Sequence, residues 1–174
     1  MSLETEAAPL IVTLAFDASS FRHFQAMRVR HFPAHRNHIP AHLTLFHHLP
    51  GGEEREVARI LRETTREVSP FALAVTGLRF LGYGCAYEIG APALADLRGE
   101  LAERFRSWLT PQDAQGFRPH VTIQNKAPAP EAKALFAELS AGFEPFEATG
   151  TGLLLWHYRG GPWEAAGAFP FVGS

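Results

Sequence analysis

One four-residue pattern, a histidine, an aliphatic residue, a threonine and a second aliphatic residue, occurs twice in the chain. The copies are His42-Leu43-Thr44-Leu45 and His120-Val121-Thr122-Ile123. Each copy lies in a short segment with the alternation of a β-strand. Side chains alternate along a strand, so the histidine and the threonine share one face and the aliphatic residues point into the core. The duplication indicates a chain of two similar halves, each presenting a polar pair on a rigid strand.

The remaining chain alternates between strand and helix patterns bounded by Pro, Gly and capping residues. We expect strands at Pro9–Phe16, His42–His47, Phe71–Leu81, Ala86–Ile89, Phe117–Gln124, Phe146–Tyr158 and Trp163–Phe171. We expect helices at Asp17–Arg30, Glu53–Val68, Pro92–Trp108 and Pro130–Ser140. The third helix has the clearest apolar stripe, which is typical of a helix packed on a sheet. Its members are Leu94, Leu97, Leu101, Phe105 and Trp108.

This order of elements predicts an α+β fold. A strand, helix, strand, helix and hairpin are followed by a partial copy, and no linker separates the two. We therefore expect residues 1–174 to form a single domain of two fused lobes that share one active-site groove, with sheets facing the groove and helices outside. A doubly wound parallel sheet is the alternative. Two observations count against the parallel sheet: Gly82 and Gly84 are typical of the turn of a β-hairpin, and the sequence has no glycine-rich phosphate-binding loop.

Charge and cysteine content narrow the class of protein. The formal net charge of −2 argues against a protein that coats long nucleic acids, because such binding needs many Lys and Arg contacts to phosphate. A small anion or an RNA end is compatible with it. The lone Cys85 cannot form an internal disulfide, and no segment resembles a cleaved signal or a membrane span. We therefore expect a cytoplasmic protein that does not bind membranes, and we expect a monomer.

The segment between Asp17 and Glu53 contains no acidic residue, whereas it holds four arginines and most of the histidines. Two interpretations stay open. The segment forms an ordinary solvated helix face, or its positive field helps to attract an anionic substrate.

The duplicated pair suits acid/base chemistry on a phosphate. Breaking a cyclic phosphodiester needs one group that takes a proton from the attacking water and another that protonates the leaving oxygen. Imidazoles titrate near working pH, so His42 and His120 suffice. The hydroxyls of Thr44 and Thr122 can donate hydrogen bonds to phosphate oxygens as charge develops. We assign His120 as the base and His42 as the acid, although the reverse assignment fits the sequence equally well.

The stretches PAHLTLFHHLPG and FRPHVTIQNK resemble the two-histidine (2H) phosphoesterase superfamily, especially bacterial 2′–5′ RNA ligases and RNA 2′,3′-cyclic phosphodiesterases. The resemblance implies a bilobal fold with pseudo-twofold symmetry, in which two antiparallel-rich sheets face a central groove. It implies that His42 and His120 are catalytic, that Thr44 and Thr122 bind phosphate, and that no metal or other cofactor is needed. The implied substrate is a nucleotide or RNA-end phosphodiester, hydrolysed or reversibly formed during RNA processing. Its identity and the direction of reaction stay open.

Strand alternation extends the predicted site beyond the two motifs. It places Phe46 on the face of His42, and Gln124 and Lys126 on the face of His120. Phe46 either stacks on a base or, the interpretation we favour, packs as part of the groove wall. Some superfamily members carry a basic residue five positions after the second histidine, where this chain has Asn125.

Two other classes of protein compete with this interpretation. Histidines 31, 35, 38 and 42 suggest a zinc-dependent hydrolase, but prolines 33 and 40 interrupt the segment and it contains no Cys, Asp or Glu. A non-catalytic module that binds nucleotides or RNA termini would need phosphate donors but not two titrating groups. Cys85 lies in a glycine-flanked turn without a nucleophile motif, which favours a structural thiol.

Overall fold

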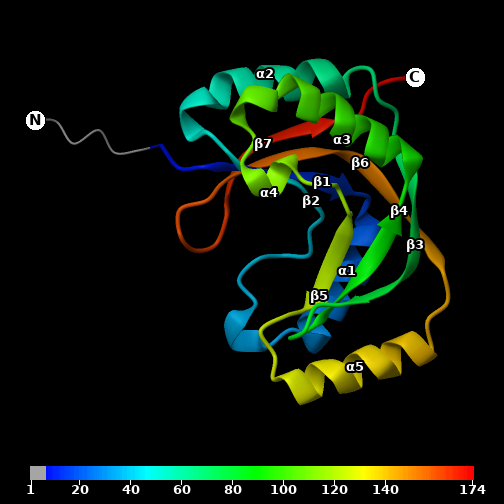
Figure 1. Ribbon diagram of the computed structural model, residues 1–174. Coiled ribbons are helices and arrows are strands. Elements are labelled where there is room, and N and C mark those ends of the chain that lie inside the picture. The colour runs from blue at the N-terminus through cyan, green and yellow to red at the C-terminus, as the bar shows by residue number, and fades with distance from the viewer. Residues whose placement is uncertain (1–6) are drawn as a thin grey trace, which may run out of the picture.

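The computed structural model describes residues 7–174 (Figure 1). The strands are β1 (Leu10–Phe16), β2 (Thr44–Leu49), β3 (Phe71–Phe80), β4 (Cys85–Gly90), β5 (His120–Gln124), β6 (Phe146–His157) and β7 (Glu164–Pro170). The helices are α1 (Ala18–His31), α2 (Glu54–Thr65), α3 (Pro92–Arg104), α4 (Pro111–Ala114) and α5 (Ala129–Ala141). None of the helices within residues 7–174 is long and apolar enough to cross a bilayer.

The strands form one seven-stranded sheet in the order β2-β1-β6-β3-β4-β5, with β7 added beside β6. All these pairings are antiparallel, so the predicted α+β fold is confirmed and the parallel alternative is wrong. The sheets expected for the two halves are joined into one curled sheet. The reason is that β6 is long enough to pair with β3 through residues 146–150 and with β1 and β7 farther along.

Glycine in β6 allows the close approach of β7. A Cβ atom on Gly152 would lie 2.7 Å from the carbonyl oxygen of Phe169, nearer than real Cβ atoms come to backbone. A side chain at this position would therefore push β7 away from the sheet.

Helices cover the sheet in two groups (Figure 1). Helices α2 and α3 contact each other, and α2 packs on β6 and β7, whereas α1 packs on β5 and α5 on β3 and β4. The apolar stripe predicted for the third helix is buried from Leu94 to Phe105. The α-helix itself ends at Arg104, and a 3-10 turn, Arg106–Trp108, follows it.

Candidate active site

The two histidine motifs lie at the outermost strands of the sheet order, β2 and β5. The second motif begins β5 at His120, whereas His42 and Leu43 directly precede β2, which begins at Thr44 and not at His42 as expected. Because the sheet curls, these strands approach each other, and Thr44 of the first motif lines the same pocket as His120 of the second. Arg28 of α1 also links the motifs. It donates a hydrogen bond to the carbonyl oxygen of Thr122, 3.1 Å away, and its charge lowers the pKa of His42. The tertiary structure thus gathers both motifs at one site.

The two imidazole rings are held in the same way. Nδ1 of His42 lies 2.8 Å from the carbonyl oxygen of Pro40, and Nδ1 of His120 lies 3.0 Å from that of Arg118. A carbonyl oxygen can only accept, so Nδ1 of each ring carries the hydrogen and donates it. This fixes the tautomer and leaves Nε2 of each ring as the atom that can take or give a proton.

Burial lowers the pKa of both histidines. The pKa of His42 falls to about 4, mainly through burial and further through the charges of Arg28, His120 and His47, against an opposing hydrogen bond to Pro40. The pKa of His120 is also lowered by burial and by neighbouring positive charges, those of Arg79 and Arg118 included. Both rings are therefore neutral near pH 7 in the free protein.

One pocket at the site is basic. It has a volume of about 190 Å³, and we call it the basic pocket. Its functional side chains are those of Thr44, His47, Arg79, Arg98, Arg118 and His120. Arg79 and Arg118 both pair with the single carboxylate of Glu88, at 3.1 and 3.7 Å, and the carboxylate of Asp113 also lines the pocket. The three arginines outnumber these two carboxylates, so the pocket keeps an excess of positive charge. Such a pocket suits an anionic group.

A second pocket, of about 410 Å³, is mostly apolar and lies beside His42; we call it the aromatic pocket. The centroids of the Trp163 and His42 rings are 4.7 Å apart. Phe21, Leu154 and Trp156 also line this pocket. His42 belongs to the aromatic pocket and Thr44 to the basic pocket, so the first motif separates an apolar compartment from a charged one.

The predicted positions of Phe46 and Gln124 on the histidine face are wrong. Phe46 is fully buried, 5.2 Å from the Phe105 ring, and Gln124 is buried where its amide donates to the carbonyl oxygen of His31. The cause is the same in both strands. The pairing register shifts by one residue directly after each threonine, between Thr44 and Phe46 and between Thr122 and Gln124. Such a bulge reverses the alternation, so the next residue turns into the interior.

Lys126 also departs from the predicted face. Strand β5 ends at Gln124, and Lys126 is exposed in the following turn with a φ of 60°, where strand alternation no longer applies. It lines neither the basic nor the aromatic pocket. Its backbone N–H donates to the Asn125 side chain. Thr122 is half-buried and likewise lines neither pocket.

Several residues at the site belong to no sequence motif and were not predicted as site residues. Arg28 is nearly buried, and burial lowers its pKa to about 10. Together with His47 it comes from the acid-free segment, so charge patterning pointed to the region but not to these residues. Arg79 comes from β3, and its Nη1 lies 3.3 Å from Nδ1 of His120. Because that Nδ1 already donates to a carbonyl, the guanidinium acts on the ring through its charge.

The segment considered as a zinc site contains no recognisable set of ligands. Across residues 7–174, no three or more His, Cys, Asp or Glu side chains are grouped so as to hold a metal ion. Cys85 is buried, and burial raises its pKa to about 11, as expected for a structural thiol.

Comparison with known proteins identifies the family. A family model described as the 2′-5′ RNA ligase superfamily matches residues 16–162. The chain belongs to this superfamily. The resemblance seen in the two histidine motifs is thereby confirmed, and membership supports a phosphoesterase activity of the two-histidine kind in general. A search of curated proteins by sequence finds no match.

Several solved structures have the same fold as this protein. The protein TT0787 of Thermus thermophilus superposes with a TM-score of 0.62 at 18% identity, covering 95% of this chain and 99% of that one. E. coli LigT complexed with 3′-AMP superposes with a TM-score of 0.62 at 17% identity, covering 95% of this chain and 99% of LigT. E. coli LigT complexed with NADP+ superposes with a TM-score of 0.57 at 19% identity, covering 96% of this chain and 99% of LigT.

Proposed function

We propose that this protein cleaves a 2′,3′-cyclic or 2′–5′ nucleotide phosphodiester with His42 and His120 as its acid/base pair. The observation that carries the proposal is the matched tautomer of the two rings. Each histidine donates Nδ1–H to a carbonyl two residues earlier in the chain, so each offers only Nε2 for proton transfer. Two such rings beside a basic pocket are what an acid/base cleavage of a phosphodiester requires.

In the proposed reaction, Nε2 of one histidine takes a proton from water as the water oxygen bonds to phosphorus. The phosphorus–oxygen bond to the ribose oxygen breaks, and Nε2–H of the other histidine protonates that oxygen. A phosphomonoester and a free hydroxyl result. Thr44 donates a hydrogen bond to a non-bridging oxygen, and Arg79 supplies positive charge beside His120, so that both stabilise the transition state.

The lowered pKa values favour a reversal of the roles assigned from the sequence. His42, whose pKa is about 4, is available as the base because it stays unprotonated over most of the working range. His120 is then the acid. We infer this assignment from burial, since the His42 ring is the more strongly affected by it.

Two features support a nucleotide as the substrate. The aromatic pocket beside His42 offers ring faces on which a base can stack, and the basic pocket takes the phosphate. Similar proteins point to the same class, since E. coli LigT has been solved in complexes with 3′-AMP, NADP+ and ATP. We propose that the halves of the chain act as one domain, because residues of both motifs line the basic pocket.

A substrate screen tests the proposal. We expect turnover of one or more 2′,3′-cyclic mononucleotides, 2′–5′ dinucleotides or RNAs with cyclic ends, and we expect it to persist in excess EDTA. The physical reason is that imidazole, and not a bound cation, protonates the leaving oxygen. Product release is measured by chromatography with and without chelator. Activity that EDTA abolishes and zinc restores would instead support the zinc-dependent hydrolase.

The pH dependence of kcat/KM should be bell-shaped with its maximum on the acidic side of neutrality. His42 must be unprotonated to act as the base, so kcat/KM rises as pH passes about 4. His120 must be protonated to act as the acid, so kcat/KM falls as pH passes its pKa, which lies below the ordinary 6.5. Initial rates at low substrate concentration between about pH 3.5 and 9 check this. A maximum on the alkaline side of neutrality would contradict the assignment.

A further inference from the structure

A third histidine lines the basic pocket and has no part in the proposed cleavage. The bulge after Thr44 reverses the alternation of β2, so His47, rather than Phe46, faces this pocket together with Thr44 and His120. The side chain of His47 is 44% exposed, which leaves it accessible to a ligand.

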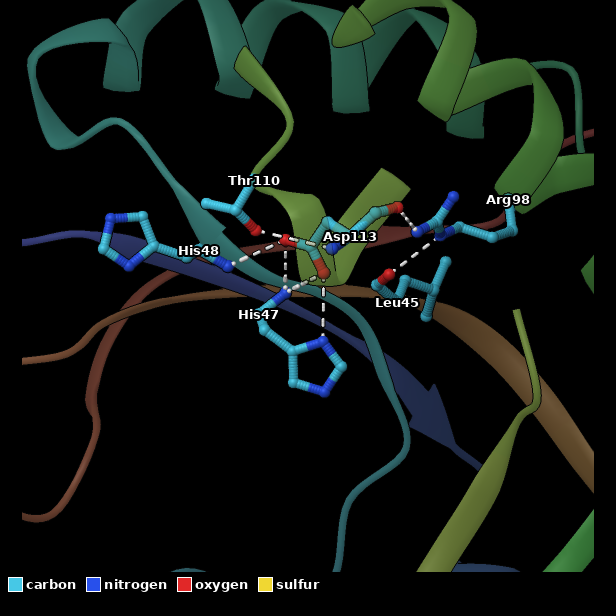
Figure 2. A network of polar contacts seen from close by, with 6 residues as sticks. All are labelled: Leu45, His47, His48, Arg98, Thr110 and Asp113. Atoms are coloured by element: carbon cyan, nitrogen blue, oxygen red, sulfur yellow. Dashed lines mark hydrogen bonds and ion pairs between the residues drawn. The ribbon is translucent and has the colours of Figure 1, made fainter. Parts of the chain in front are cut away.

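Asp113 of α4 fixes the orientation of this histidine (Figure 2). Its carboxylate, 1% exposed, accepts the backbone N–H of His47 at 2.9 Å and that of His48 at 3.0 Å. It also lies 3.0 Å from Nδ1 of His47. Helix α4 is held in turn by Arg98, which donates to the carbonyl oxygens of Asp113 and Leu45 at 2.6 and 2.8 Å. The histidine therefore rests on a rigid, buried support.

The support also fixes which nitrogen of His47 is free. Burial would raise the pKa of Asp113, but the hydrogen bonds from the His47 ring and the two backbone N–H groups outweigh it, and the pKa is lowered. The carboxylate is therefore ionised and can only accept, so Nδ1 of His47 donates to it. Nε2 is left for a ligand. The ring of His48 points in another direction in Figure 2 and lines a separate cavity with Pro50.

The basic pocket holds more cationic groups than one reacting phosphate uses. In the proposed cleavage, His120, Thr44 and Arg79 surround that phosphate. His47 and Arg118 line the same pocket; the guanidinium of Arg118 lies 3.7 Å from Glu88, and its side chain is 73% exposed. When the His47 ring carries both of its hydrogens, Nδ1–H donates to Asp113 and Nε2–H can donate a charge-assisted hydrogen bond to an anion in the pocket.

We propose that His47 binds a second phosphate of the substrate, adjacent to the phosphate that reacts. The inference rests on the proposed function and narrows its substrate class. Preferred substrates are 2′,3′-cyclic nucleotides that carry a further phosphate on the 5′ oxygen, either as a terminal group or as the linkage to a preceding nucleotide at an RNA end. Asp113 acts as a positioning residue through His47.

The experiment compares three substrates: adenosine 2′,3′-cyclic phosphate, the same compound with a 5′-phosphate, and a diadenosine ending in a 2′,3′-cyclic phosphate. For the parent protein we expect either form of second phosphate to lower KM about tenfold or more, the size expected for a hydrogen bond between charged groups. His47→Ala should remove this gain, so that the ratio of KM between the simple cyclic nucleotide and either substrate with a second phosphate falls to about one. His48→Ala, the matched control on the same strand and the same carboxylate, should keep the gain.

Equal KM values for all three substrates in the parent, or a gain that His47→Ala retains, would overturn the inference while leaving the proposed function intact. A gain with the dinucleotide alone would assign the site to RNA ends. If none of the three substrates is turned over, the proposed function fails. Binding measured by calorimetry then tests separately whether His47 binds a second phosphate. The parent should bind adenosine 3′,5′-bisphosphate more tightly than adenosine 3′-phosphate, and His47→Ala should bind both alike. Melting temperatures of the variants verify that the fold is kept.

Discussion

Replacing either His42 or His120 with alanine is expected to lower kcat about 10²–10⁴-fold, with substrate affinity largely kept. Each ring is asked to move a proton through Nε2 in the step that breaks the phosphodiester, and neither is the main source of positive charge in the basic pocket. The double variant should be little worse than either single one, because removing the acid or the base already disables most of the step that the other assists. Single-turnover rates and equilibrium binding of a cyclic nucleotide measure the two effects separately.

His48→Ala is the matched control, since this exposed histidine lies on the same strand as the first motif but outside both pockets. It should retain the parent rate. His120→Ala should also lose the alkaline fall in the pH profile, because His120 is the group assigned to that limb. Parental turnover in both single variants would mean that the motifs are scaffolding and that the catalytic roles of His42 and His120 are wrong.

Thr44→Val is expected to lower kcat on the order of 10²-fold, with a smaller change in KM. Thr44 lines the basic pocket with His120, and its hydroxyl is the donor that we propose for a phosphate oxygen that gains charge in the transition state. Valine has the same shape and keeps strand β2 intact, but it offers no donor, so the loss falls on the transition state. Steady-state kinetics on the best cyclic substrate from the screen give both parameters.

Thr76→Val serves as the control for this substitution. Thr76 is an exposed threonine of β3 whose hydroxyl donates to the carbonyl oxygen of Glu88, and it is not among the residues that line the basic pocket. It should leave kcat unchanged. If Thr44→Val and Thr76→Val have the same small effect, Thr44 is not a phosphate donor and the charge stabilisation must come from the arginines.

Local sequence patterns were sufficient for most of the helices and strands and for the histidine motifs. Hydrophobic alternation and capping residues act within a few positions along the chain, which is why β1, β6 and the stripe of α3 agree closely with expectation. The duplicated motif marked the proposed catalytic pair for the same reason, since spacing along one strand determines which side chains lie together.

Helix α4 was missed although its signal is present. Thr110 accepts a hydrogen bond from the backbone N–H of Asp113, and Pro111 occupies the first turn, which is a regular helix start. The helix is only four residues long and has no apolar periodicity to draw attention to it. Its importance comes from Asp113 reaching β2, a contact between segments far apart in the sequence.

The face of each residue after the motifs was decided by strand pairing. Register is a property of two strands, and the bulges that follow Thr44 and Thr122 exist only because β2 pairs with β1 and β5 with β4. These bulges turn Phe46 and Gln124 into the interior and leave His47 facing the basic pocket. The sequence by itself determined which two segments carry the histidines and what chemistry the histidines offer. The tertiary structure decided which other side chains join them, because a one-residue shift in pairing reverses the alternation on which any local prediction of facing depends.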